Sequence, residues 1–145
     1  MKYEKIDREL FIKNRQKFVE HLEPNSIAIF NSNDIYPISA DSTMPFQQHR
    51  DIFFLSGVDQ EESVLVIFPD AFEEKHREIL FLKETSELIA IWEGEKLTKK
   101  SAFETSGIKT VFWLDQMDNI LNALLAQADK VYININEHTR ANTEV

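Results

Sequence analysis

The chain has 145 residues with 43% hydrophobic and 11% aromatic residues, which suits one globular domain and excludes a disordered chain. Its formal net charge of −9 argues against nucleic acid and against anionic membrane surfaces as partners, because both bind basic patches. The absence of cysteine excludes disulfides and thiolate metal sites, and we expect a single domain over residues 1–145 in the cytoplasm, with neither a signal peptide nor a membrane span.

The first predicted element is an amphipathic helix. Asp7 can cap it, and the pattern continues to Leu22, before the Pro24-Asn25 break. Apolar residues at helical spacing mark the face that we expect to be buried, and basic residues mark the face that we expect to be exposed. The buried set is Leu10, Phe11, Phe18, Val19 and Leu22, and the exposed set is Arg8, Lys13, Arg15 and Lys17.

Short apolar runs predict the strands of the first half. Residues 26–31 (SIAIFN) predict a buried strand, and an irregular loop follows to about residue 50. Residues 51–55 and 63–68 then predict two strands that form a hairpin around a turn at residues 56–62.

The second half alternates strands and helices. The helix at residues 115–128 has the clearest pattern: Asp115 caps it, and Met117, Ile120, Leu121, Leu124 and Leu125 form its buried face. The other predicted elements are strands at residues 79–83, 111–113 and 130–135 and helices at 85–92 and 98–105, the last ended by Gly107.

Interleaved helices and strands predict an α/β fold with a mixed sheet and helices on its faces. We expect the core to include Ile29, Phe53, Leu65, Ile67, Leu80, Leu121 and Ile133.

The sequence assigns neither a catalytic residue nor a metal ligand to this chain. The four histidines (His21, His49, His76 and His138) lie outside any HExxH motif, and GxSxG, GxGxxG and P-loop motifs are absent. His49 and Asp51 form the one suggestive cluster, because alternate residues of a strand face the same side. A metal there would need a further ligand, and an independent hydrolase built on this pair stays an open alternative.

Trp92 lies in the run IAIWEGEKLT, directly before a glycine-containing charged stretch. One interpretation is that Trp92 anchors a helix end against the sheet, and the sequence alone favours it. The other is that Trp92 is exposed and meets a partner, because tryptophan is enriched at interfaces.

Two motifs resemble a known family. Residues 45–57 (PFQQHRDIFFLSG) follow the pattern P-(F/Y)-x-Q-(N/D)-x-D-(F/I)-x-(Y/F)-(L/F)-(T/S)-G, and residues 91–94 (IWEG) match an (E/I)-W-x-G element. On these motifs, and in order over nearly the whole chain, the sequence resembles the N-terminal domain of Xaa-Pro aminopeptidases (aminopeptidase P), which is related to domains of prolidases and creatinases. His49, Val58 and Glu61 depart from the usual family residues, which are Asn or Asp, an aromatic residue and Pro.

The resemblance implies a ribonuclease-H-like mixed sheet without nuclease activity. It implies a complete enzyme that removes the N-terminal residue from peptides with proline second. Two divalent metal ions, typically manganese, would be held by two Asp, one His and two Glu of a C-terminal pita-bread domain that this chain lacks. This chain would then be a non-catalytic domain for oligomerisation and substrate entrance in a homodimer or homotetramer, with Trp92 as a wall beside a neighbouring active site. A standalone module that binds a peptide or small ligand is the alternative.

Overall fold

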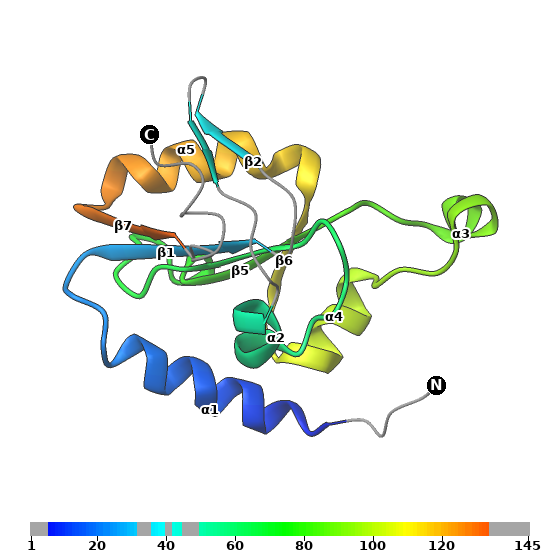
Figure 1. Ribbon diagram of the computed structural model, residues 1–145, viewed down its shortest axis with the longest axis horizontal. Helices are drawn as coiled ribbons and strands as arrows, with labels where there is room; N and C mark the ends of the chain where they lie inside the picture. The colour runs from blue at the N-terminus through cyan, green and yellow to red at the C-terminus, as the bar shows by residue number, and fades with distance from the viewer. Residues whose placement is uncertain (1–5, 32–35, 40–41, 45–49, 134–145) are drawn as a thin grey trace, which may run out of the picture.

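The computed structural model describes residues 6–31, 36–39, 42–44 and 50–133 (Figure 1). A five-stranded sheet runs through the domain in the order β6-β5-β4-β1-β7. Strand β4 pairs antiparallel with β1 and β5, whereas β6 and β7 at the two edges pair in parallel. The strands are β1 (Ser26–Asn31), β4 (Val64–Ile67), β5 (Glu78–Leu82), β6 (Thr110–Trp113) and β7 (Lys130–Ile133).

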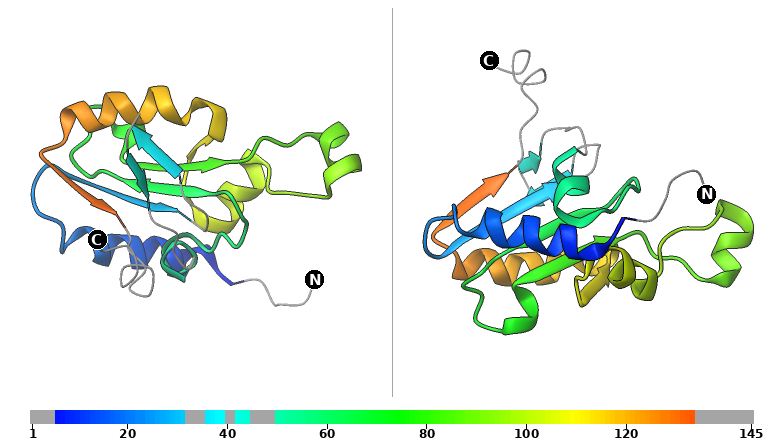
Figure 2. Two further views of the ribbon diagram at one scale, coloured as in Figure 1. Left: turned by 45° about the horizontal axis from the view of Figure 1, so that its top comes forward. Right: turned by 90° about the horizontal axis from the view of Figure 1, so that it is seen from below.

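Helices cover both faces of this sheet (Figures 1 and 2). Helices α1 (Arg8–Val19), α2 (Arg50–Ser56) and α4 (Lys99–Ser106) lie on one face, and α5 (Met117–Gln127) lies on the other. Helix α3 (Glu87–Glu93) projects from one end of the domain. This arrangement confirms the predicted α/β fold with a mixed sheet. The smaller elements are the antiparallel pair β2 (Tyr36–Ser39) and β3 (Ser42–Met44) and the 3-10 turns η1 (Glu74–His76) and η2 (Leu114–Gln116).

Each face of the sheet buries its own apolar cluster, because alternate strand residues point to opposite faces. The cluster on the α5 side comprises Ile27, Ile29, Val64, Val66, Phe68, Ala71, Ile79, Phe81, Met117, Leu121 and Leu124. The cluster on the α2 and α4 side comprises Ala28, Phe30, Ile52, Leu55, Val58, Leu65, Ile67, Leu80, Leu82, Ala102, Ile108 and Val111. The predicted core residues Ile29, Leu65, Ile67, Leu80 and Leu121 are confirmed as buried, and Ile133 packs against the α5-side cluster while partly exposed.

The predicted hairpin over residues 51–68 is wrong, because residues 51–55 belong to helix α2. Ile52 and Leu55, three residues apart, both face the core, whereas Phe53 is 37% exposed and is not the core residue that we expected. The Ser56 hydroxyl donates to the Ile52 carbonyl oxygen at 2.6 Å, a contact that belongs to a helix. Aromatic residues favour strands, but the spacing of the two buried aliphatic residues fits a helical turn.

Helix α1 begins as predicted, and most of its predicted apolar face meets the core: Phe11 is buried, and Phe18, Val19 and Leu22 pack against the cluster on the α2 and α4 side. The Asp7 carboxylate accepts from the Glu9 N–H at 3.0 Å, and the helix ends at Val19, before the expected Leu22. Leu10 is half exposed, and Arg15, which we expected on the exposed face, is 1% exposed. Both assignments were wrong, and Arg15 is buried because its guanidinium contacts groups of two other elements.

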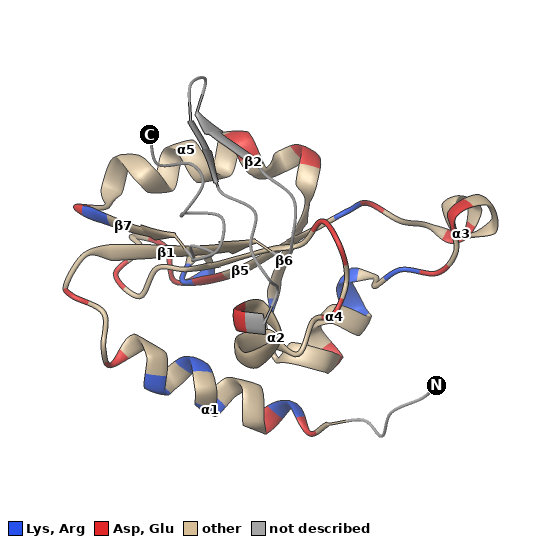
Figure 3. Cartoon of the chain, viewed as in Figure 1, with Lys and Arg blue, Asp and Glu red and all other residues tan. Residues whose placement is uncertain are grey.

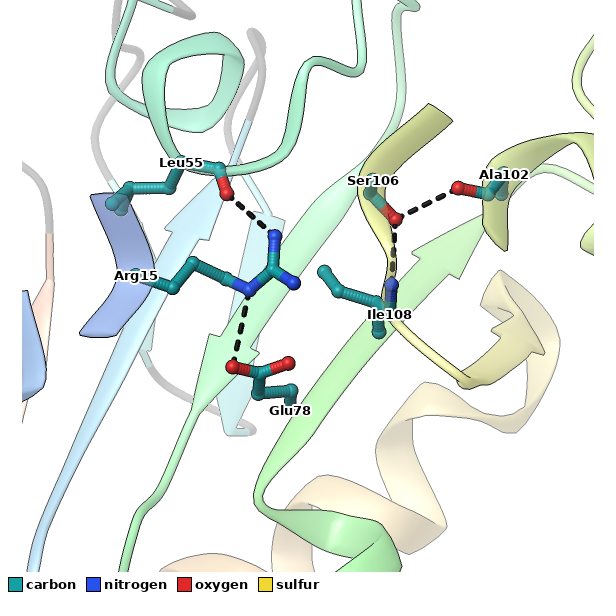
Figure 4. A network of polar contacts seen from close by, with 6 residues as sticks. All are labelled: Arg15, Leu55, Glu78, Ala102, Ser106 and Ile108. Atoms are coloured by element: carbon teal, nitrogen blue, oxygen red, sulfur yellow. Dashed lines mark hydrogen bonds and ion pairs between the residues drawn. The ribbon is translucent and has the colours of Figure 1, made fainter. Parts of the chain in front are cut away.

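Those partners hold α1 against the rest of the domain (Figure 4). The Arg15 Nε lies 3.1 Å from Glu78 Oε2 at the start of β5, and Nη1 donates to the Leu55 carbonyl oxygen of α2 at 2.9 Å. Burial of a charged group is tolerated only where it is paired and hydrogen-bonded, and Arg15 meets that condition with contacts from two different elements.

The remaining elements lie close to their predicted positions, except that β2 and β3 lie where we expected an irregular loop. Ser86 caps α3, Thr98 and Ser101 form a capping box on α4, and Gly107 ends α4 with a φ of 81°. Asp115 is not the cap of α5, because it lies in η2 and Gln116 occupies the N-cap position. None of the helices within the described ranges has the length and apolarity that crossing a bilayer requires.

Leu121 tests the core on the α5 side. Leu121→Ala is expected to lower the free energy of unfolding by about 2–5 kcal/mol, because it removes buried methyl groups and leaves a cavity. The matched control is Leu88→Ala on the exposed face of α3, for which we expect a change within about 0.5 kcal/mol. Urea unfolding of both variants checks this, and equal midpoints would show that this face of α5 is not core.

Arg15 tests the attachment of α1. Arg15→Met keeps much of the side-chain volume but leaves Glu78 and the Leu55 carbonyl without their cation, so we expect a loss of about 1.5–3 kcal/mol. Lys17→Met, on the exposed face of the same helix, is the control. A thermal melt in which both variants unfold with the parent would contradict the role assigned to Arg15.

Candidate functional site

The most exposed apolar surface of the described residues lies on a projecting segment. We call residues 83–98 the arm: it leaves the end of β5, forms α3 and returns at the N-terminus of α4 (Figures 1 and 2). Helix α3 has no buried residue. A Cβ placed on Gly94, where α3 ends with a φ of 90°, would meet no atom within 4 Å. The arm is therefore surrounded by solvent at its tip.

The outer face of α3 is apolar. Leu88, Ile91 and Trp92 are 68%, 73% and 82% exposed, and their spacing of three and four residues places them on one face of the helix. Ile89 and Ala90, on the other side of the helix, are only partly exposed. A helix on a globular domain normally turns its apolar face to the core, so this orientation leaves an apolar face available to a partner.

The structure excludes one of the two interpretations of Trp92. With 82% of its surface exposed, Trp92 does not pack against the sheet, and the interpretation as an internal anchor is wrong. The second tryptophan, Trp113 on β6, packs against the α2 and α4 side of the core instead.

Charged residues lie on both limbs of the arm and along α3 (Figure 3). The arm carries Glu84, Glu87, Glu93 and Glu95 against Lys83 and Lys96. Lys83 Nζ lies 3.6 Å from Glu93 Oε1 across the neck of the arm, and both side chains are nearly half exposed. Ion pairs of that exposure contribute little stability, so this pair alone does not fix the arm.

The described histidines do not form a catalytic or metal-binding arrangement. His21 follows the C-terminus of α1 in solvent, and the His76 ring lies 6.5 Å from the Phe112 ring. His49 and His138 lie outside the described residues. Asp51 lies in the first turn of α2 and not on the strand that we expected. Within residues 6–31 and 50–133, no three His, Asp or Glu side chains gather closely enough to hold a metal ion.

A charged depression lies at the opposite end of β5 from the arm. It has a volume of about 570 Å³ and is lined by Glu74, Lys75, Arg77, Glu78, Gly107, Lys109 and Thr110. Several of its charges are already paired: Lys75 lies 3.7 Å from Glu73, Glu78 pairs with Arg15, and Arg77 donates to the Ala71 carbonyl. It is therefore a weaker candidate for a binding site than the arm.

Comparison with known proteins identifies the family of this chain. The profile of the family described as aminopeptidase P, N-terminal domain, matches residues 11–132. The chain belongs to this family. The Xaa-Pro aminopeptidase of Escherichia coli is 30% identical over 128 residues, which is 88% of this chain and 29% of that protein. The resemblance inferred from residues 45–57 and 91–94 is thereby confirmed.

Solved aminopeptidase P structures have the same fold. The aminopeptidase PepP of Pseudomonas aeruginosa aligns with a TM-score of 0.73 and 25% identity over 90% of this chain and 29% of its own. A zinc-substituted aminopeptidase P from E. coli in complex with product aligns with a TM-score of 0.69 and 29% identity, over 89% of this chain and 29% of its own. The chain spans less than a third of the length of the curated relatives it matches.

Metal titration tests the hydrolase alternative. We expect calorimetric titration of this chain with Mn²⁺ or Zn²⁺ to show no stoichiometric sub-micromolar binding, because a metal site needs three or more clustered ligands. Stoichiometric binding that disappears in Asp51→Asn would overturn this expectation and revive the site at His49 and Asp51.

Proposed function

We propose that this chain is the non-catalytic N-terminal domain of an Xaa-Pro aminopeptidase, and that its arm forms part of the substrate entrance of a neighbouring subunit. The observation that carries the proposal is the exposure of Trp92 at the tip of a projecting helix within a domain of this family. The IWEG element that contains Trp92 also supports it, because the family resemblance implies that this element can approach a neighbouring active site.

The chemistry of the outer face suits a proline-containing peptide. A pyrrolidine ring is compact and apolar, and the flat indole of Trp92 offers a broad apolar surface against which such a ring can pack. Leu88 and Ile91 extend the same surface along the helix, so they can contact the neighbouring subunit while Trp92 faces the substrate. Burial of this face against a partner removes apolar surface from water, which favours assembly.

The remaining parts of the proposal concern the complete protein. It would release the N-terminal residue from peptides with proline second, at two divalent metal ions, typically manganese, held by a C-terminal catalytic domain. The present domain would contribute to a homodimer or homotetramer in the cytoplasm. Support comes from the relatives named Xaa-Pro aminopeptidase, which are about three times as long as this chain, and from the family resemblance.

Trp92→Ala in the complete enzyme tests this function. We expect kcat/KM for proline-second peptides to fall about tenfold or more, the equivalent of about 1–3 kcal/mol of lost apolar contact. The melting temperature should change little, because the side chain is exposed in the domain itself.

The control is Phe72→Ala, an equally exposed aromatic residue in the loop between β4 and β5, for which we expect normal kinetics. Steady-state kinetics and a thermal melt on the same preparations separate the possibilities. Unchanged turnover in Trp92→Ala would refute the substrate-entrance role, and binding of proline peptides by this chain alone would favour the standalone module.

A further inference from the structure

The placement of Trp92 depends on how the arm is attached, because α3 itself packs against nothing. Helix α3 has no buried residue, and Gly94 lies in open space. The ion pair between Lys83 and Glu93 joins two residues of the arm to each other, so it closes the neck of the arm without fixing its direction. The direction must be set where the two limbs of the arm meet the domain.

The returning limb meets the domain at Gln60. The Leu97 N–H donates to Gln60 Oε1 at 2.9 Å, and the Leu97 side chain packs against the core cluster on the α2 and α4 side. Gln60 lies in the loop between α2 and β4, where its own carbonyl accepts from the Ser63 hydroxyl at 2.6 Å and where Val58 is buried. The acceptor is therefore presented by a loop that is fixed to the core.

The orientation of the Gln60 amide follows from this contact. A backbone N–H can only donate, so the side chain must direct its oxygen at Leu97. Its nitrogen, Nε2, is buried and has no hydrogen-bond partner among the described residues. Because a buried donor without a partner costs free energy, the Nε2 group of Gln60 lowers the stability of this loop. What the side chain contributes is one acceptor directed at the arm.

We propose that Gln60 is a positioning residue: its side-chain oxygen fixes the returning limb of the arm and thereby holds Trp92 in place. The consequence for turnover rests on the proposed function of Trp92, whereas the attachment itself is a property of this domain. Without the acceptor, the arm samples more orientations, and the apparent affinity for a partner or substrate falls with the fraction of arms that point correctly. Loss of the Gln60 acceptor changes the orientation of the arm but not the Trp92 side chain.

Three variants isolate this oxygen. Gln60→Met keeps the length of the side chain and removes the acceptor. Gln60→Glu keeps an acceptor oxygen but replaces the buried nitrogen, which bonds to no described residue, by a second oxygen and adds a negative charge, so it is compared only where urea unfolding shows parental stability. Gln127→Met is the matched control: Gln127 Oε1 accepts from the Phe72 N–H at 3.0 Å, so it too joins a glutamine to a distant backbone N–H, but between α5 and the loop between β4 and β5.

The first experiment uses the present chain. Hydrogen exchange of the amides of residues 86–97 should become about three- to tenfold faster in Gln60→Met, the factor that corresponds to one hydrogen bond, and should stay at the parental rate in Gln60→Glu and Gln127→Met. In a Trp113→Phe background, the fluorescence anisotropy of Trp92 should fall in Gln60→Met alone. Urea unfolding shows whether any variant has lost global stability. Arm exchange at the parental rate in a folded Gln60→Met, or equally fast exchange in Gln60→Glu, overturns the proposal.

The second experiment measures turnover in the complete enzyme. Gln60→Met should lower kcat/KM for proline-second peptides about three- to tenfold, mainly through KM, and Gln60→Glu should restore it. These measurements distinguish failure of the substrate-entrance role from failure of the attachment through Gln60. Faster arm exchange with normal kinetics in both Gln60→Met and Trp92→Ala refutes the substrate-entrance role and leaves the attachment standing. A kinetic defect in Trp92→Ala with unchanged arm exchange in Gln60→Met refutes the attachment.

Discussion

The buried guanidinium of Arg15 is the contact on which the α1 side of this domain depends. It joins three elements that are distant in sequence, since α1 carries the charge, β5 supplies Glu78 and α2 supplies the Leu55 carbonyl (Figure 4). A buried charge needs nearby partners, and the ion pair with Glu78 and the hydrogen bond to the Leu55 carbonyl therefore link α1 to β5 and to α2. The aromatic and aliphatic side chains of α1 then fill the space that these links define.

The position of α1 over the sheet requires glycine at residues 57 and 107, and both glycines occur in the same local motif. Helices α2 and α4 both end in Ser-Gly followed by a β-branched residue, and each serine hydroxyl donates to the carbonyl four residues earlier and accepts from the N–H two residues later. A Cβ on Gly57 would lie 2.5 Å from the Phe11 ring, and one on Gly107 would lie 2.7 Å from Ile12. Both glycines also have positive φ, which disfavours other residues. Helix α1 therefore packs directly on the ends of two helices.

Elements with one consistent apolar face could be predicted from the sequence, and contacts between distant residues could not. Helix α5 and strands β1, β4 and β5 carry their burial pattern within a few residues, so their periodicity identifies them. Helix α2 was mistaken for a strand because three of its residues, Ile52, Phe53 and Phe54, favour strands. The contacts that define the helix are the hydrogen bond from Ser56 to Ile52 and the packing of Gly57 against α1. The burial of Arg15 depends on Glu78, and the role of Gln60 depends on Leu97, 37 residues later. Trp92 was singled out by the family motif, but its exposure was visible only in the structure.

These contacts form a continuous path from the core to the arm. Arg15 fixes the end of α2 at Leu55, Gly57 turns the chain out of that helix, and Gln60 follows three residues later to accept from Leu97. The last step combines the hydrogen bond from Leu97 to Gln60 with the packing of the Leu97 side chain, beneath a helix that has no buried residue. Segments that bind partners are commonly the least stable parts of a domain. Under the proposed function, an arm held in this way would be directed before it meets a partner, and the partner would complete its placement by burying the apolar face of α3.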